Sequence, residues 1–329
     1  MSKKEAYLFI SAMLRAREPR MLSREKAERM LDAPSFSESA KLLTDCGYED
    51  MSQMNAAQID GALSRHRAEV FRELMLLLPE KQLVDVFRVK YDYHNAKVIL
   101  KAEAMGTDGT VLLSESGRVS PEALLSAYQE DRLNALPSRL ATALSEGREL
   151  LARSGNPQLA DFALDKAYFA ELTELAKTSE SSFLRGYVAI LADSTNLKSA
   201  VRTLRMGKNA DFLRGALVTG GKIDGDRLVS AASGEGLAAL FNGSALSEAA
   251  ALGAAAAEGG SMTAFERACD NAVMAYLVGA KLKAYGEEPV IAYLAAVENE
   301  ITAVRMILTG RLAGIDPQVI RERLRDLYA

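Results

Sequence analysis

The sequence predicts an all-α protein, and three observations carry the prediction. Helix-forming Ala, Leu, Glu, Arg, Lys and Met dominate the composition, while proline occurs eight times. Residues 62–78, 80–105 and 261–278 contain neither glycine nor proline. Alternating β-branched residues, which are typical of strands, are rare. We therefore expect a chain of consecutive helices without a sheet.

Helix starts and loops can be placed from local signals. RVSPEALLSAY puts Ser120 at the N-cap and Pro121 at the first helical position, and GIDPQVIRERL repeats the device with Asp316 and Pro317. Glycines indicate loops within 106–117 and 207–225. The Gly/Ala/Ser-rich segment 241–261 is open to two interpretations, a flexible segment or a short Ala-rich helix between two turns.

The bulk properties exclude several classes of function. A net charge of −4 gives no electrostatic attraction to nucleic acid. The two cysteines and the two histidines lie far apart in the sequence, so no zinc-type ligand cluster can be recognised. No apolar run reaches the roughly 18 residues that a membrane span needs. We expect no cofactor and no metal, and any role at a membrane would be exercised from the aqueous side.

One stretch of the chain occurs three times. The first copy is YDYHNAKVILKAEAMG (91–106), the second ADSTNLKSAVRTLRMG (192–207) and the third NEITAVRMILTGRLAG (299–314). The third copy has Ala303 where the others have asparagine. The repeated positions are Asp92, Asn95, Lys97 and Gly106 in the first copy, Asp193, Asn196, Lys198 and Gly207 in the second, and Glu300, Arg305 and Gly314 in the third.

The segments after each copy also match, which predicts three related domains. They read GRVSPEAL (117–124), GKIDGDRL (221–228) and GIDPQVI (314–320). The expected helical domains are 1–128, with additional N-terminal helices, then 129–232 and 233–329. Each repeat is of the size that one small helical domain requires.

Helical geometry assigns a structural role to the repeated residues. On a helix, the acid and the cation flank an apolar stripe and stand about 140° apart, too far around the helix to pair with each other. We therefore expect them to pair with other helices of the same domain. The predicted pairs are Lys198 with Asp165, Arg305 with Glu266, and Asp193 with Lys166. Ser64 interrupts this pattern in the first domain, so Lys97 needs another partner.

Two patterns resemble enzyme sites, one a base and acid pair and the other a phosphate-binding loop, and both depart from what such sites require. His94 and Asp92 could form a base and its orienting acid, but the histidine becomes Thr195 and Thr302 in the other copies. The segment GALVTGGKID departs from a phosphate-binding loop, because five residues separate Gly215 from Gly221 and Ile223 follows the lysine. We expect no catalytic, cofactor-binding or metal-binding residue.

The repeats and their surroundings resemble a known family. KYDYHNAKVILKAEAMG, ALDKAYFAEL leading to ADSTNLKSAVRTLRMG, and ENEITAVRMILTGRLAGIDPQVIRERL are similar to the C subunit of bacterial and archaeal V/A-type rotary ATPases. The counterpart in the eukaryotic vacuolar enzyme is its d subunit. The N-terminal ISAMLRAREPRMLSREKAERML also fits, so the resemblance spans most of the chain; segment 241–261 and Ala303 depart furthest from the pattern.

The resemblance implies three similar helical domains around a pseudo-threefold axis, shaped as a funnel. It implies a non-catalytic central-stalk subunit that links the D- and F-type axle subunits to the proteolipid rotor ring and transmits torque for ion transport. The protein would lie on the cytoplasmic side of the cell membrane, peripheral to it. The alternative is a helical-repeat adapter for a partner protein outside a rotary ATPase. The sequence does not distinguish proton from sodium coupling, or ATP synthesis from hydrolysis.

Overall fold

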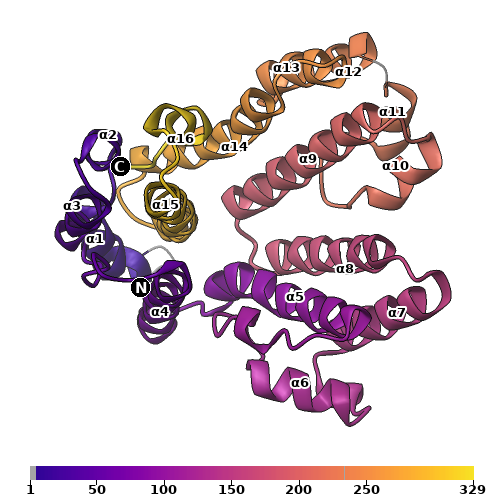
Figure 1. Ribbon diagram of the computed structural model, residues 1–329, viewed down its shortest axis with the longest axis horizontal. Helices are drawn as coiled ribbons and strands as arrows, with labels where there is room; N and C mark the ends of the chain where they lie inside the picture. Colours follow the sequence, from indigo (N-terminus) through magenta and orange to yellow (C-terminus); the bar gives the residue numbers. More distant parts are fainter. Residues whose placement is uncertain (1–4, 233) are drawn as a thin grey trace. The chain divides into compact units, whose positions relative to one another are not determined.

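The computed structural model describes residues 5–232 and 234–329, and every regular element within them is helical (Figure 1). The predicted all-α fold class is confirmed. The chain divides into two compact units, the first formed by Met1–Lys81 with Ser261–Ala329 and the second by Gln82–Gly260. The three-domain division that the repeats suggest is a different partition of the chain and stays a prediction.

The first unit is built around its longest helix. α15 packs against six other helices of this unit, and its residues from Pro289 to Val297 are all buried. Burial on every side explains why its sequence is apolar beyond one narrow stripe. The helices of this unit are α1 (Leu8–Arg17), α2 (Arg24–Asp32), α3 (Phe36–Lys41), α4 (Ala56–Leu77), α14 (Met262–Val278), α15 (Glu287–Leu312) and α16 (Pro317–Arg323), with 3-10 turns at Glu5–Tyr7, Glu18–Arg20, Thr44–Cys46 and Gly279–Leu282.

The second unit packs its helices in antiparallel layers. α5 lies along α7 and α8, and α9 returns beside α8 and contacts α13 (Figure 1). The helices are α5 (Gln82–Met105), α6 (Pro121–Gln129), α7 (Ser138–Ser154), α8 (Pro157–Thr178), α9 (Ser182–Arg205), α10 (Ala210–Ala216), α11 (Gly225–Ser230), α12 (Gly234–Leu240) and α13 (Ser247–Ala257), with 3-10 turns at Thr110–Leu112 and Leu133–Ala135.

The helix ends follow the local signals. The side chain of Ser120 accepts a hydrogen bond from the N–H of Ala123, and that of Asp316 accepts one from the N–H of Gln318, so both predicted caps are confirmed. Of the two interpretations of segment 241–261, the Ala-rich helix is observed as α13. Its small buried side chains let it approach α9 closely.

The three repeated glycines end the three long helices. Gly106, Gly207 and Gly314 have φ angles of +61°, +62° and +69°. In each copy, the N–H of the following residue bonds back to a carbonyl in the last turn, over 2.9 to 3.0 Å. This is the left-handed C-terminal turn that glycine adopts without strain, so the same residue recurs at the same place.

Candidate functional site

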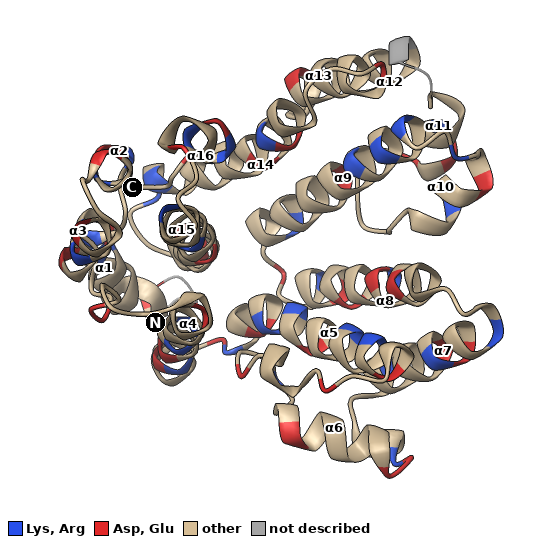
Figure 2. Cartoon of the chain, in the orientation of Figure 1, with Lys and Arg blue, Asp and Glu red and all other residues tan. Residues whose placement is uncertain are grey.

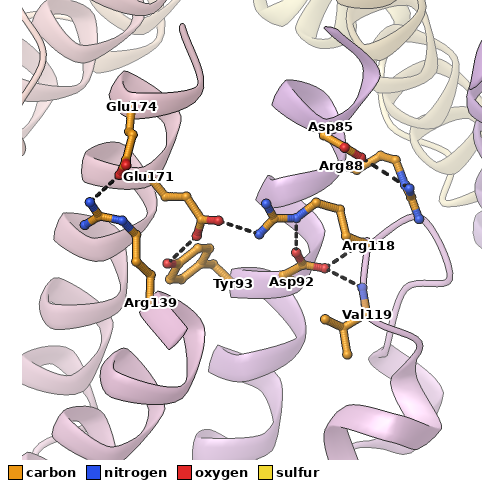
Figure 3. A network of polar contacts seen from close by, with 9 residues as sticks. All are labelled: Asp85, Arg88, Asp92, Tyr93, Arg118, Val119, Arg139, Glu171 and Glu174. Atoms are coloured by element: carbon orange, nitrogen blue, oxygen red, sulfur yellow. Dashed lines mark hydrogen bonds and ion pairs between the residues drawn. The ribbon is translucent and has the colours of Figure 1, made fainter. Parts of the chain in front are cut away.

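The repeated acids each hold a loop through its backbone, and we call this arrangement a carboxylate latch. Asp92 on α5 is fully buried, and its Oδ1 accepts hydrogen bonds from the N–H groups of Arg118 at 2.7 Å and Val119 at 3.1 Å (Figure 3). A Cβ atom at Gly117 would lie 2.6 Å from Asp92 Oδ1. The glycine that precedes each cap in the first two copies is therefore required by the close approach of the loop.

The second copy forms the same latch with different residues around it. Asp193 on α9 accepts hydrogen bonds from the N–H groups of Lys222 and Ile223, both at 3.0 Å. A Cβ atom at Gly221 would lie 2.1 Å from Asp193 Oδ1. Burial raises the pKa of Asp193, and the two N–H donors and Lys222 only partly oppose this rise.

The repeated asparagines fix the same loops one turn further along the helix. The Asn95 amide donates to the carbonyl of Ser114 at 2.9 Å and accepts from its N–H at 2.8 Å. Asn196 makes the same two bonds to Val218, at 2.9 and 2.8 Å. Each asparagine amide thus satisfies both the N–H and the C=O of one loop residue.

In the third copy, the latched segment comes from the other end of the chain. Glu300 on α15 accepts hydrogen bonds from the N–H of Leu22 at 2.6 Å and the hydroxyl of Tyr48 at 2.8 Å. Leu22 directly precedes Ser23, the N-cap of α2, as Val119 precedes Ser120. The N-terminal α2 therefore packs against α15 after the third latch, as α6 packs against α5 after the first.

The first latch also contains a buried ion-pair network. Arg118 Nε donates to Asp92 Oδ2 at 2.7 Å, and its Nη2 lies 2.8 Å from Glu171 Oε1 on α8 (Figure 3). The Tyr93 hydroxyl donates to Glu171 Oε2 at 2.8 Å. Burial raises the pKa of Asp92 more than Arg118 and the backbone donors lower it, and burial together with Glu171 raises the pKa of Tyr93. The network ties the loop to a helix of the next repeat.

The predicted pairings of the repeated cations are wrong. Asp165 pairs with Lys97, at 2.6 Å from Nζ to Oδ1, and not with Lys198, which lies half-buried on α9. Arg305 pairs with Asp60 of α4 at 2.7 Å and not with Glu266. The reason is packing: α5 packs against α8, which carries Asp165, and α15 packs against α4, which carries Asp60.

The predicted pair of Asp193 with Lys166 is also absent. The carboxylate of Asp193 is occupied by the two loop N–H groups described above, and Lys166 Nζ donates instead to the carbonyl of Arg214 at 3.2 Å. A backbone partner is not visible in a pattern of charged side chains, which explains the error.

The two histidines lie in unrelated surroundings. Exposed His94 has its Nε2 3.0 Å from the carbonyl oxygen of Leu112 and makes no contact with Asp92. His66 on α4 is half-buried with its ring centroid 4.2 Å from that of Tyr48, and burial lowers its pKa. The carboxylate of Asp92 is thus engaged by Arg118 and the loop rather than by His94.

Two further properties of the chain concern metal binding and membrane spanning. Among residues 5–232 and 234–329, no group of three or more His, Cys, Asp or Glu side chains is placed to hold a metal ion. Every helix in this described part is too short or too polar to span a bilayer.

The chain is similar to known proteins over most of its length. The model of the ATP synthase (C/AC39) subunit family matches residues 10–323. The C subunit of the V-type sodium ATPase of Enterococcus hirae is 24% identical over 325 residues, covering 98% of this chain and 99% of that protein. The C subunit of the A-type ATP synthase of Methanocaldococcus jannaschii is 25% identical, covering 98% and 86%. Since the family model covers almost all of the sequence, the chain belongs to the ATP synthase (C/AC39) subunit family.

Proposed function

We propose that the protein is a non-catalytic central-stalk subunit of a V/A-type ATPase or ATP synthase. It links the central axle to the membrane rotor ring and transmits torque for coupled ion transport. The observation that carries the proposal is the family match over residues 10–323, supported by relatives named as C subunits of a sodium ATPase and of an ATP synthase.

The latches are consistent with a mechanical role. A part that transmits torque must resist bending, and its stiffness depends on how firmly the segments between its helices are held. Here three loop segments are hydrogen-bonded to carboxylates on the longest helices, at Asp92, Asp193 and Glu300. We propose that all the repeated positions, the asparagines, cations and C-terminal glycines included, are structural and that none takes part in catalysis.

The proposed partners follow from the same role. They are the D- and F-type axle subunits and the proteolipid subunits of the rotor ring, with the protein on the cytoplasmic side of the membrane and peripheral to it. The three repeats, 1–128, 129–232 and 233–329, would act as three similar mechanical units. A net charge of −4 fits a protein assembly better than a nucleic-acid partner.

The proposal can be tested with the intact complex. We expect the protein to co-purify with axle and rotor-ring subunits, and its deletion to uncouple ATP hydrolysis from ion pumping. The ratio of ions moved to ATP hydrolysed in membrane vesicles is the measurement, and restoring the protein should restore that ratio. Full coupling without the protein would contradict the proposed function, and purification with unrelated proteins alone would favour an adapter outside a rotary ATPase.

A further inference from the structure

The second unit contains a cavity that the latches do not explain. It has a volume of about 460 Å³ and lies between the C-terminal half of α5, the loop 107–113 and α6. Its apolar wall is formed by Val98, Ile99, Ala102, Leu113 and Leu125. Polar side chains, among them Glu103, Asp108 and Arg148, stand around this wall. An apolar wall surrounded by polar side chains is typical of a site that binds a side chain or a short segment.

In the second repeat, the matching segment of the chain forms a helix. Residues 208–220, between Gly207 and Gly221, form α10, which packs on α9 and α11 with Leu213 only 1% exposed. In the first repeat, residues 107–116 between the matching glycines are three residues shorter and form only the 3-10 turn Thr110–Leu112. The segment that follows the long helix is therefore a packed helix in one copy and a short turn beside a cavity in the other.

The short loop also displays apolar side chains. Val111 is 87% exposed and Leu112 is 64% exposed. The loop is held close to α5, since a Cβ atom at Gly109 would lie 2.9 Å from the Cβ of Ala102. Two neighbouring apolar side chains beside an apolar cavity form a surface that a partner would cover favourably.

The charges around this surface favour a basic partner. Glu103 and Asp108 belong to the rim, and Glu115 and Glu122 are exposed on the loop and the first turn of α6, whose start is acidic and whose far end carries both charges in Figure 2. The rim cation Arg148 is already paired with Asp131, at 2.7 Å. A ligand with lysine or arginine would therefore meet an excess of acids.

We propose that this cavity and the exposed turn Thr110–Leu112 dock a basic amphipathic helix of another subunit of the ATPase complex. We take α10 of the second repeat as the model for such a helix. The acidic residues around the cavity favour a helix that carries lysine or arginine. The identity of the partner as a subunit of this complex depends on the proposed function above.

A cross-linking experiment tests the docking site directly. Benzoylphenylalanine is placed at position 111 in the purified intact complex, and a matched sample carries it at position 206, an exposed methionine in the second repeat outside the cavity. We expect illumination to link position 111, and not position 206, to a helical segment of another subunit that contains lysine or arginine. Links from position 111 only to this chain or to lipid would overturn the proposal.

A reconstitution titration measures the contribution of the same surface. The protein is added back to complex stripped of it, and the concentration that restores half of the coupled ion transport is determined. The double variant Val111→Ser, Leu112→Ser should need about tenfold more protein, because two side chains lose their burial in the interface. Asp108→Asn keeps the oxygen that accepts the Thr110 N–H and removes only charge, so a smaller, salt-dependent shift is expected.

The controls separate the possible failures. Met206→Ser should restore transport at the wild-type concentration, and the helix content and thermal unfolding of the serine variants should match the wild type, since the altered side chains are exposed. An unchanged titration of the double variant would overturn the docking site alone. If the wild-type protein neither assembles with the complex nor restores coupling, the proposed function itself fails.

Discussion

Asp92 and Asp193 occupy the same place in two copies of one repeat, but only Asp92 shares its carboxylate with an arginine. Both acids accept hydrogen bonds from two consecutive backbone N–H groups in the loop before a helix. At the first site Arg118 extends the contact to Glu171, whereas its counterpart Lys222 is exposed. The backbone contacts are therefore what the repeat requires, and the ion pair is an addition that joins one loop to α8.

Removing the arginine should have the largest effect. Arg118→Met leaves two buried carboxylates, Asp92 and Glu171, without their shared cation, and we expect the free energy of unfolding to fall by about 3–5 kcal/mol. Urea unfolding followed by circular dichroism measures the change. Lys222→Met, the matched substitution at the second latch, should change stability by about 0.5 kcal/mol or less. Equal losses in the two variants would show that the ion pair adds nothing to the backbone contacts.

Adding a side chain at Gly221, where the loop approaches Asp193, should cause the second-largest loss of stability. Gly221→Ala would place a Cβ atom 2.1 Å from Asp193 Oδ1, so the loop must move and the latch must lengthen. We expect a loss of about 2 kcal/mol, the range found for overpacked sites. Thermal unfolding can be compared with Gly225→Ala, where the new Cβ would meet Leu217 at an ordinary 3.4 Å. A tolerated Gly221→Ala would contradict the tight latch.

Charge at the second latch should give stability a measurable pH dependence. Burial raises the pKa of Asp193 above its ordinary value of 3.8, so the folded form holds the proton more firmly than the unfolded form. The contribution of this group therefore decreases as pH rises from about that ordinary value through the folded pKa. Asp193→Asn removes the titration, so its unfolding free energy relative to wild type should increase from pH 4 to pH 7. A constant difference would argue against the raised pKa.

The smallest effect is expected at the histidine of the first repeat. His94 is exposed and does not contact Asp92, so His94→Ala should lower stability by about 1 kcal/mol or less. Coupled ATP hydrolysis and ion pumping should remain close to normal in the intact complex. A specific loss of activity with unchanged folding would instead indicate a chemical role for the Asp92 and His94 pair.

The sequence predicts the parts of this structure that depend on local pattern. The helices, the caps at Ser120 and Asp316 and the repeated stretch itself follow from composition, capping residues and spacing. The ion pairs cannot be predicted in this way. Spacing shows which edge of a helix carries a charge, but it does not show which helix packs against that edge. Lys97 reaches Asp165 on α8, and Arg305 reaches Asp60 on α4.

Other contacts could not be predicted because they involve the backbone or distant segments. The N–H groups that Asp193 binds have no signature in side-chain chemistry, and the one available signal is the glycine that recurs before the cap in the first two copies, Gly117 and Gly221. The Arg118–Glu171 ion pair could not be predicted from the repeats, because these two residues occur in only one copy. The pairing of Glu300 with Leu22 joins opposite ends of the chain, which no local pattern reveals.

Native-state amide hydrogen exchange tests the central claim most directly, because it reports on each latched N–H group separately. In the wild-type protein the amides of Leu22, Val119 and Ile223 should exchange slowly, although all three lie outside helices. In Asp193→Ala, exchange should accelerate at Lys222 and Ile223 while Val119 keeps its protection. Rapid exchange at all three amides in the wild type, or an unchanged rate at Ile223 in the variant, would contradict the carboxylate latch.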